Sequence, residues 1–275
     1  MFRSGFEMTD IPYYIMSGSG NTFIVVDNRE HQIKDPKRFA AEKSKLNAVD
    51  GVLFVEKPKE KQTHFFMRIV NADGSEAEAC GNGYRCIGLY AHQHLAFPKF
   101  IRVGTLGGPV EIDVASPQAI KVKMVDPKDY RKGIEIKMGQ ESLSASFINT
   151  GVAHTVIFKD DLNNIPVETL GKSIRYHQMF APNGTNVNFV KVEGKNKLSI
   201  RTYERGVEAE TLACGTGSVA AAIVANLEGK IETPVEVLPK SGERLKVDFR
   251  YSGNKVTNVY LEGPATENSK GSVSI

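Results

Sequence analysis

The chain of 275 residues contains an internal repeat that divides it into two similar halves. The segment GSEAEACGNG at 74–83 is matched by GVEAETLACGTG at 206–217, and their cysteines, Cys80 and Cys214, lie 134 positions apart. Self-similarity at a fixed spacing indicates a structural unit that occurs more than once. Because the spacing is close to half of the chain, we expect two related units of roughly 130 residues each.

The repeat extends well beyond the two cysteine motifs. Three further pairs of residues share a spacing of 131 to 134 positions: Gly20 with Gly151, Arg68 with Arg201, and Val103 with Val237. We therefore predict two domains, 1–130 and 131–275, joined across the polar stretch 125–142, with a terminal segment of one domain able to cross to the other. Residues 1–12 and 266–275 have no partner in the repeat, and we expect them to be partly disordered.

Each half carries the same predicted order of strands and helices. Runs of β-branched and aromatic residues predict strands in the first half at 13–17, 23–27, 51–56, 64–70, 100–105, 109–114 and 119–124. The second half repeats them at 144–150, 154–158, 185–192, 197–203, 234–238, 243–250 and 256–262. A long helix follows each Gly-x-Gly, and shorter helices begin at Asp35-Pro36 and Ile165-Pro166, where proline suits the first turn. This pattern predicts an α+β protein in which each domain wraps its sheet around a central helix.

The composition narrows the class of protein. Hydrophobic residues make up 41%, and no apolar run approaches the roughly 20 residues that span a bilayer, so we do not expect a membrane protein. With 35 Lys and Arg against 32 Asp and Glu, the net charge is only +3, which argues against a nucleic-acid partner and favours a small-molecule substrate. Glu7 and Asp10 stand where a signal peptide would be apolar, so we expect a cytoplasmic protein.

The three cysteines are too few, and odd in number, for a secreted disulfide framework. Cys80 is followed by Gly-Asn-Gly and Cys214 by Gly-Thr-Gly, each just before a predicted helix. The start of a helix exposes unpaired N–H groups and the positive end of its dipole, which together stabilise an anion. A thiol at this position can have its pKa lowered from ~8.5 to about 3.5–7.5. The glycines allow backbone N–H groups to close around a carboxylate or phosphate.

One such motif would be a weak signal, since a buried cysteine usually only fills space. Two copies related by a repeat can bring both helix starts around one shared pocket. Two thiols that face each other across a carboxylate site can remove a proton from one face of a carbon and return one to the other face, which inverts a stereocentre. Cys80 and Cys214 are therefore candidate catalytic residues.

Four segments together resemble the signature sequences of the diaminopimelate epimerases: SGSGNTFIVVD at 17–27, NADGSEAEACGNGYRC at 71–86, APNGTNVNFV at 181–190 and YERGVEAETLACGTGS at 203–218. The resemblance implies two pseudo-symmetric domains, each a curved, mostly antiparallel sheet or barrel around a helix, with the active site in the cleft between them. It also implies epimerisation of LL- to meso-diaminopimelate without pyridoxal phosphate, another cofactor or a metal. That reaction belongs to lysine and peptidoglycan precursor biosynthesis.

The resemblance assigns roles position by position. Cys80 and Cys214 match the acid/base pair of the family. Helix-start residues match those whose N–H groups hold the carboxylate at the reacting centre: Gly81, Asn82, Gly215 and Thr216. Other residues match those that line the pocket and bind the distal amino-carboxylate end: Asn21, Asn71, Asn186, Glu204 and Arg205. The planar fork of arginine suits a carboxylate, and asparagine offers a donor and an acceptor without charge.

The chain departs from the family pattern in the region of the distal pocket. Thr22 replaces the aspartate of a usual Gly-Asn-Asp, and Val152 replaces the asparagine of a usual Gly-Asn-Pro-His. The segment ERGVEAETLAC is one residue longer than the usual ERGVGETLAC. These changes leave the thiols untouched. We expect Glu78 and Glu210, each close before its cysteine, to help position the two loops.

Other conspicuous residues have structural explanations. Cys86 lies six residues after Cys80, about 240° around a helix, so the two cannot easily share a face and we expect Cys86 in the core. His92 and His94 fit a solvated helix end better than a metal site. For His154 we expect a structural hydrogen bond.

The sequence also allows other functions to be considered. The nearest is a proline racemase or 4-hydroxyproline epimerase of the same fold, which also pairs two cysteines but acts on a substrate without a distal amino-carboxylate group. A protein that only binds an amino acid is disfavoured by the retention of both thiols. The cysteine spacing argues against a redox or metal protein. The sequence leaves a homodimer open.

Overall fold

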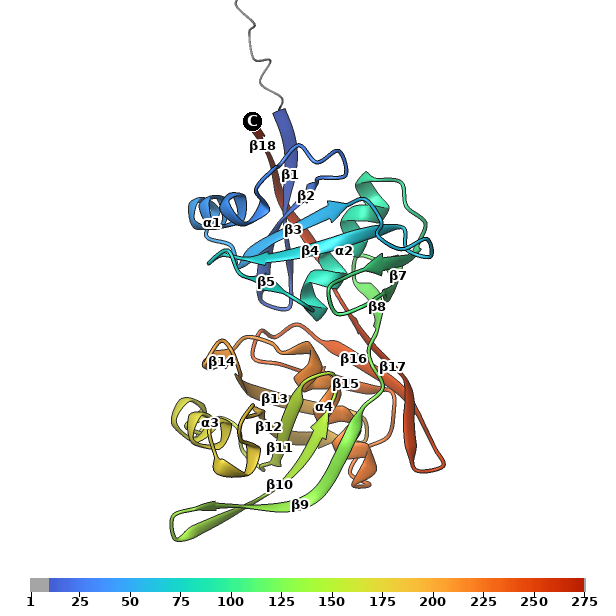
Figure 1. The fold of residues 1–275 in the computed structure, drawn as a ribbon. Coiled ribbons are helices and arrows are strands. Elements are labelled where there is room, and N and C mark those ends of the chain that lie inside the picture. Colours follow the sequence, from blue (N-terminus) through green and yellow to red (C-terminus); the bar gives the residue numbers. More distant parts are fainter. Residues whose placement is uncertain (1–9, 275) are drawn as a thin grey trace, which may run out of the picture. The chain divides into compact units, whose positions relative to one another are not determined.

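The computed structural model describes residues 10–274, which form two units (Figure 1). The first unit contains the described residues up to Ile120 together with those from Ala265 onward, and the second is Lys121–Pro264. The units divide at residue 120 rather than at the predicted residue 130, because the strand that begins at Lys128 pairs within the second sheet. Within the described residues, no helix combines the length and apolar character needed to cross a membrane.

The sheet of the first unit is open and mostly antiparallel. Its strands are β1 (Asp10–Gly18), β2 (Asn21–Asp27), β3 (Gly51–Glu56), β4 (Phe65–Asn71), β5 (Glu76–Ala77), β6 (Phe100–Gly104), β7 (Val110–Ser116) and β18 (Thr266–Ser274), with β8 (Ala119–Lys123) at the division. The pairing runs β18–β1–β2–β3–β4–β6–β7, and only β2–β3 and β4–β6 are parallel. The short strand β5 pairs with β4 and leads into the first cysteine loop.

The second unit repeats this pairing scheme. Its strands are β9 (Lys128–Met138), β10 (Glu141–Asn149), β11 (Ala153–Phe158), β12 (Asn186–Gly194), β13 (Lys197–Glu204), β14 (Ala209–Thr211), β15 (Val235–Leu238), β16 (Leu245–Ser252) and β17 (Lys255–Gly263). The pairing runs β9–β10–β11–β12–β13–β15–β16–β17, again with only two parallel pairs, β11–β12 and β13–β15. The predicted pseudo-symmetry of two α+β units is confirmed.

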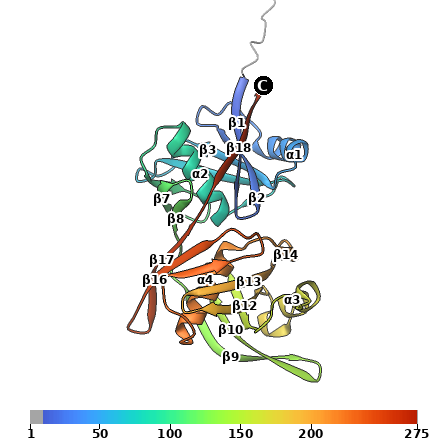
Figure 2. The same ribbon diagram turned by 180° about the vertical axis from the view of Figure 1, so that it is seen from behind.

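One long helix is buried in each unit. These are α2 (Gly81–His94) and α4 (Gly215–Leu227), and their side chains are buried from Asn82 to Ala91 and from Gly217 to Ala225. Figure 2 shows α4 among the strands of the second unit. Alanine and valine dominate α4, so the helix can be buried on all sides without polar groups that need partners. Each sheet therefore wraps a central helix, as the sequence predicts.

The shorter helices are α1 (Pro36–Asn47) and α3 (Val167–Arg175), with one 3₁₀ turn, η1 (Gln178–Phe180). At the start of α1, the Asp35 carboxylate accepts a hydrogen bond from the Arg38 N–H, and Pro36 occupies the first turn. Both helices lie between equivalent parallel strands: α1 joins β2 to β3, and α3 joins β11 to β12. The two predicted helix starts are confirmed.

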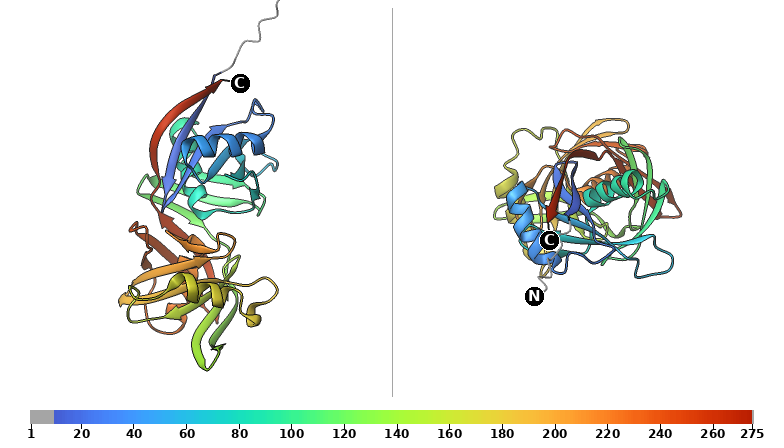
Figure 3. Two further views of the ribbon diagram at one scale, coloured as in Figure 1. Left: turned by 90° about the vertical axis from the view of Figure 1, so that its left-hand side faces the viewer. Right: turned by 90° about the horizontal axis from the view of Figure 1, so that it is seen from above.

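Two polar segments differ from their predictions. Residues 266–274, predicted to be partly disordered, form β18, which pairs antiparallel with β1 (Figure 3). The predicted polar connector contains β9, which pairs antiparallel with β10. These strands have the same place in the two sheets, but β18 comes last in the chain among the strands of its unit, whereas β9 comes before β10 to β17 of its own. A search for a constant spacing cannot match such strands, and their polar composition hides them further. Of residues 1–12, which were also predicted to be partly disordered, residues 10–12 lie in β1 and pair with β18, and residues 1–9 lie outside the described residues.

Candidate active site

Cys80 caps the N-terminal end of α2. Its backbone is extended, with a φ of −152°, and its Sγ accepts a hydrogen bond from the Gly83 N–H at 3.3 Å. The first N–H groups of a helix have no backbone partner, and an acceptor at this position satisfies one of them. Cys80 is partly exposed. The sulfur of this partly exposed residue therefore lies in the positive field of a helix terminus.

Cys214 has the same position at the start of α4 but a different environment. The residue is buried, its side chain makes no capping hydrogen bond, and its Sγ lies 3.4 Å from the Thr216 hydroxyl oxygen. A Cβ on Gly217 would lie only 2.4 Å from the Asn188 Oδ1 and 3.3 Å from the Cys214 Sγ. The second glycine of this motif is therefore required by close approach. The predicted position of both cysteines at loop-to-helix junctions is confirmed.

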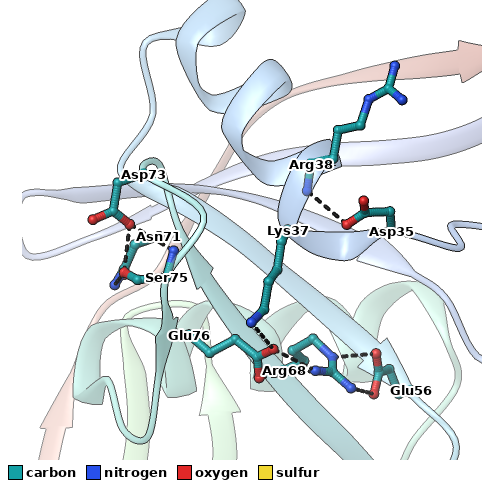
Figure 4. A network of polar contacts seen from close by, with 9 residues as sticks. All are labelled: Asp35, Lys37, Arg38, Glu56, Arg68, Asn71, Asp73, Ser75 and Glu76. Carbon is teal, nitrogen blue, oxygen red and sulfur yellow. Dashed lines mark hydrogen bonds and ion pairs between the residues drawn. The ribbon is translucent and has the colours of Figure 1, made fainter.

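An arginine–glutamate pair anchors the strand before each cysteine. In the first unit, the guanidinium of Arg68 donates to Glu76 at 3.0 Å and to Glu56 at 2.7 Å (Figure 4). In the second unit, Arg201 donates to both carboxylate oxygens of Glu210, at 2.7 and 2.9 Å. Bidentate contacts of this kind fix orientation as well as position.

Strand register identifies which of these glutamates are equivalent. Glu76 lies opposite Val70, and Glu210 lies opposite Tyr203. Glu76 therefore corresponds to Glu210. The repeat gives the same correspondence, because Glu76 and Glu210 lie 134 positions apart, as Cys80 and Cys214 do.

A chain of amide hydrogen bonds runs beside Cys80. Buried Arg85 donates to the Asn82 Oδ1 at 2.9 Å, the Asn82 Nδ2 donates to the Asn21 Oδ1 at 2.7 Å, and the Asn21 Nδ2 donates to Asp50 at 3.2 Å. Arginine can only donate, and an ionised aspartate can only accept. The two end groups therefore fix the direction of the chain and the orientation of both amides. Arg85 also donates to the Ser19 hydroxyl at 2.7 Å.

Asn71 lies in the turn between β4 and β5. Its Nδ2 donates to the Ser75 hydroxyl at 3.0 Å, and Asp73 closes the turn by accepting from the Ser75 N–H and hydroxyl (Figure 4). These hydrogen bonds from Ser75 lower the pKa of Asp73. The N–H of Ala72 donates to the Asp50 carbonyl at 3.0 Å. The first unit thus gathers the turn of Asn71 with the amide chain at one end of its sheet.

In the second unit, Asn186 organises the segment that carries Arg205. Its Oδ1 accepts from the Arg205 N–H at 2.9 Å, and its Nδ2 donates to the Ala153 carbonyl at 2.9 Å. Glu204 accepts a hydrogen bond from the Thr211 hydroxyl at 2.9 Å. Burial raises the pKa of Glu204, and the Thr211 hydrogen bond acts against this shift. These contacts bring Asn186, Glu204 and Arg205 together.

A buried polar network lies beneath the start of α4. The Asn188 Nδ2 donates to the Nδ1 of His154 at 3.1 Å, and the Thr202 hydroxyl donates to the Asn188 Oδ1 at 3.0 Å. Burial, with a contribution from the charge of Arg205, lowers the pKa of His154 to about 3. His154 is therefore neutral at physiological pH and has the structural hydrogen bond that we predicted.

The structure gathers the predicted site residues into two groups, one in each unit. The first is Asn21, Asn71, Cys80, Gly81 and Asn82, and the second is Asn186, Glu204, Arg205, Cys214, Gly215 and Thr216. The Thr150 hydroxyl holds the second helix start by donating to the Thr216 carbonyl at 3.1 Å. Among residues 10–274, no three His, Cys, Asp or Glu side chains converge in a way that could hold a metal ion.

Several residues of these networks escaped the sequence reasoning. Asp50, Arg85 and Asn188 hold predicted site residues through contacts remote in sequence. Arg85 gave one usable signal, because a charged residue stands within the apolar run of a buried helix. Cys86 lies fully buried in that helix, which confirms its place in the core.

The chain is similar to known proteins over almost its whole length. A family model described as diaminopimelate epimerase matches residues 13–129 and 146–267. A diaminopimelate epimerase from Hydrogenobaculum is 42% identical over 271 residues, which covers 94% of this chain and 96% of the relative. The chain belongs to the diaminopimelate epimerase family. A further epimerase of this family, from Methanocella arvoryzae, is 40% identical over 286 residues, which covers 98% of each of the two chains.

Solved structures share the fold at much lower sequence identity. A PhzF-family phenazine biosynthesis protein from Bacillus anthracis superposes with a TM-score of 0.69 at 15% identity, covering 98% of this chain and all of that one. A hydroxyproline epimerase from Agrobacterium vitis has the same TM-score at 12% identity, covering 97% and 93% of the two chains. These structures confirm the predicted two-unit fold.

Proposed function

We propose that this diaminopimelate epimerase family member interconverts LL- and meso-diaminopimelate, with Cys80 and Cys214 as the two acid/base groups. The observation that carries the proposal is the repeated placement of a cysteine at the start of a buried helix, once in each unit. Each sulfur lies at a helix terminus, where backbone N–H groups and the helix dipole can hold an anion.

The chemistry requires a proton acceptor on one face of the α-carbon and a donor on the other. One cysteine, as thiolate, removes the α-proton, and the other, as thiol, supplies a proton to the opposite face. The two cysteines exchange roles when the reaction runs in reverse. Negative charge develops on the α-carboxylate during the transfer, and N–H groups aimed at its oxygens stabilise that charge without any cofactor.

Binding of the substrate is divided between its two ends. The N–H groups of the helix starts hold the reacting carboxylate: Gly81, Asn82, Gly215 and Thr216. The distal amino-carboxylate end is bound by the remaining predicted residues: Asn21, Asn71, Asn186, Glu204 and Arg205. The guanidinium of Arg205 offers two parallel N–H donors to the distal carboxylate, which a lysine cannot reproduce.

The test is a stereochemical assay of purified protein with LL-diaminopimelate, in which we expect meso-diaminopimelate to form without added cofactor. Trans-4-hydroxy-L-proline, the substrate type of the alternative function, is the comparison compound, and its epimerisation in place of diaminopimelate would contradict the proposal.

We place the enzyme in the cytoplasm, where its three cysteines stay reduced. Sedimentation velocity would establish whether it is a homodimer.

A further inference from the structure

The turn that carries Arg205 has an unusual backbone. Residues 204–208 form a tight turn closed by a hydrogen bond from the Glu208 N–H to the Glu204 carbonyl at 2.8 Å. Glu208 has a φ of +58°, in the left-handed region that non-glycine residues rarely adopt. This residue also belongs to the segment that is one residue longer than the family pattern. A strained residue of this kind persists only where its surroundings hold it.

Glu208 is held mainly by Arg175, the last residue of α3. The Arg175 guanidinium donates to the Glu208 Oε1 from Nε at 3.2 Å and from Nη2 at 3.0 Å, and the Gly206 N–H donates to the same oxygen at 3.0 Å. The Arg175 side chain is only 13% exposed. Burial acts to raise the pKa of Glu208, but hydrogen bonds from Gly206, Tyr176 and Arg175 outweigh it and lower the pKa.

Arg175 and Arg205 meet at one backbone carbonyl. The Nη1 of Arg175 donates to the Asn183 carbonyl at 3.4 Å, and the Nη1 of Arg205 donates to the same oxygen at 3.3 Å. Gly184 makes room for this arrangement, because a Cβ there would lie 1.8 Å from the Arg175 Nη1. Two guanidinium groups therefore donate to the Asn183 carbonyl, and the Glu208 carboxylate offsets the charge of one of them, Arg175.

The turn of the first unit that corresponds to residues 204–208 contains no arginine. By strand register, Ala72 stands at the position of Arg205. The turn of Ala72 is closed locally by Asp73 and contains Gly74, whose φ of +85° is without strain for glycine. In the first unit, the ion pair to the neighbouring helix joins Lys37 to Glu76 at 3.6 Å, so it lies on β5 and not on the turn itself.

We propose that Arg175 and Glu208 are positioning residues, which clamp the 204–208 turn to α3 so that Arg205 presents its guanidinium to the distal carboxylate of the substrate. This inference rests on the proposed function. Neither residue touches the reacting carbon, so their loss weakens substrate binding and leaves the proton transfers intact. The clamp acts through Arg205 alone.

The experiment is a double-mutant cycle on KM and kcat for LL-diaminopimelate. The variants are Glu208→Gln, Arg175→Gln, Arg205→Lys and the double variant Glu208→Gln/Arg205→Lys, with Glu193→Gln as control because Glu193 forms an ion pair with Lys191 elsewhere in this unit. We expect Glu208→Gln to raise KM by about ten-fold with kcat within about two-fold of wild type. In the double variant, KM should be no higher than in Arg205→Lys, because residues that act as one unit are not additive.

A second variant at this position separates loss of the carboxylate from an effect on folding. Glu208→Gly removes the carboxylate but suits the positive φ, so its melting temperature should be no lower than that of Glu208→Gln while its KM rises to the same extent. Multiplying effects in the double variant, a fall in kcat at unchanged KM, or a wild-type KM in Glu208→Gly would each overturn the inference. In those outcomes the wild-type enzyme is still an epimerase. A wild-type enzyme that fails to epimerise LL-diaminopimelate overturns the proposed function, and this inference with it.

Discussion

The two cysteine-bearing units share one framework but surround their cysteines with different chemistry. Five residues after Cys80 stands Arg85, fully buried and hydrogen-bonded to Ser19 and Asn82. Five residues after Cys214 stands Val219, equally buried. The start of α2 is therefore supported by a charged side chain, whereas the start of α4 is supported by neutral groups: Thr150, Asn188 and Thr216.

The features that the units share are those that set the fold. Strand order, parallel pairs and the arginine–glutamate anchors Arg68–Glu76 and Arg201–Glu210 occur in both. The side chains near the cysteines are less constrained by strand pairing, so they can differ between the halves. This comparison indicates that the common framework places each cysteine at the start of a buried helix, while the side chains around the two cysteines differ.

The largest expected effect comes from replacing the cysteine that each unit carries at the start of its buried helix. Cys80→Ala and Cys214→Ala should each lower kcat by about 10³-fold or more, because each takes away one of two obligatory proton-transfer groups. Similar losses of kcat in the two variants would support a mechanism in which each unit supplies one proton-transferring thiol. Cys86→Ala is the matched control, since Cys86 is buried in the core of α2, and it should retain near-normal kcat. Normal turnover by either of the first two variants would contradict the two-thiol mechanism.

The second prediction uses the equivalent glycines of the two motifs. Gly217→Ala should lower the free energy of unfolding by about 2 kcal/mol, because its Cβ would press on the Asn188 Oδ1, which is held in a buried network. Gly83→Ala should change it by less than about 1 kcal/mol, because its closest neighbour is the flexible Met67 side chain at 3.2 Å. Urea unfolding of both variants measures the difference. A larger loss of unfolding free energy in Gly83→Ala than in Gly217→Ala would contradict this prediction, because it would show that the start of α2 is packed more tightly than the start of α4.

The smallest predicted effect concerns the amide chain of the first unit. Asp50→Asn replaces an obligatory acceptor with a group that can also donate, so the Asn21 amide can reverse. We expect kcat/KM to fall by about three- to ten-fold, the range of one net hydrogen bond. Asp161→Asn, which changes a carboxylate in a surface turn of the second unit, is the control and should have no effect. Unchanged kcat/KM in Asp50→Asn would show that the direction of this chain does not matter for activity.

Much of the fold followed from the sequence because its determinants are local or periodic. Apolar runs marked the buried strands, prolines marked the starts of α1 and α3, and Gly-x-Gly marked α2 and α4. The strands β9 and β18 were missed because their order in the chain is permuted relative to their order in the sheets.

The site was predictable in its cysteines but not in its supporting contacts. Cys80 and Cys214 were marked by a repeated motif. By contrast, Arg85 and Ser19 are 66 positions apart, and Arg175 and Glu208 are 33 apart, so only the folded chain brings them together. Side-chain hydrogen bonds between distant residues leave no periodic trace in a single sequence.

The central claim is that two thiols, one from each unit, serve opposite faces of a single carbon. Its most direct test is the reaction of LL-diaminopimelate in D₂O, followed at low conversion by mass spectrometry of both product and recovered substrate. Removal by one group and return by another predicts one deuterium in each molecule of meso product and none in the recovered substrate. Deuterium entering recovered LL-diaminopimelate as fast as the product would indicate a single acid/base group, and it would contradict the account.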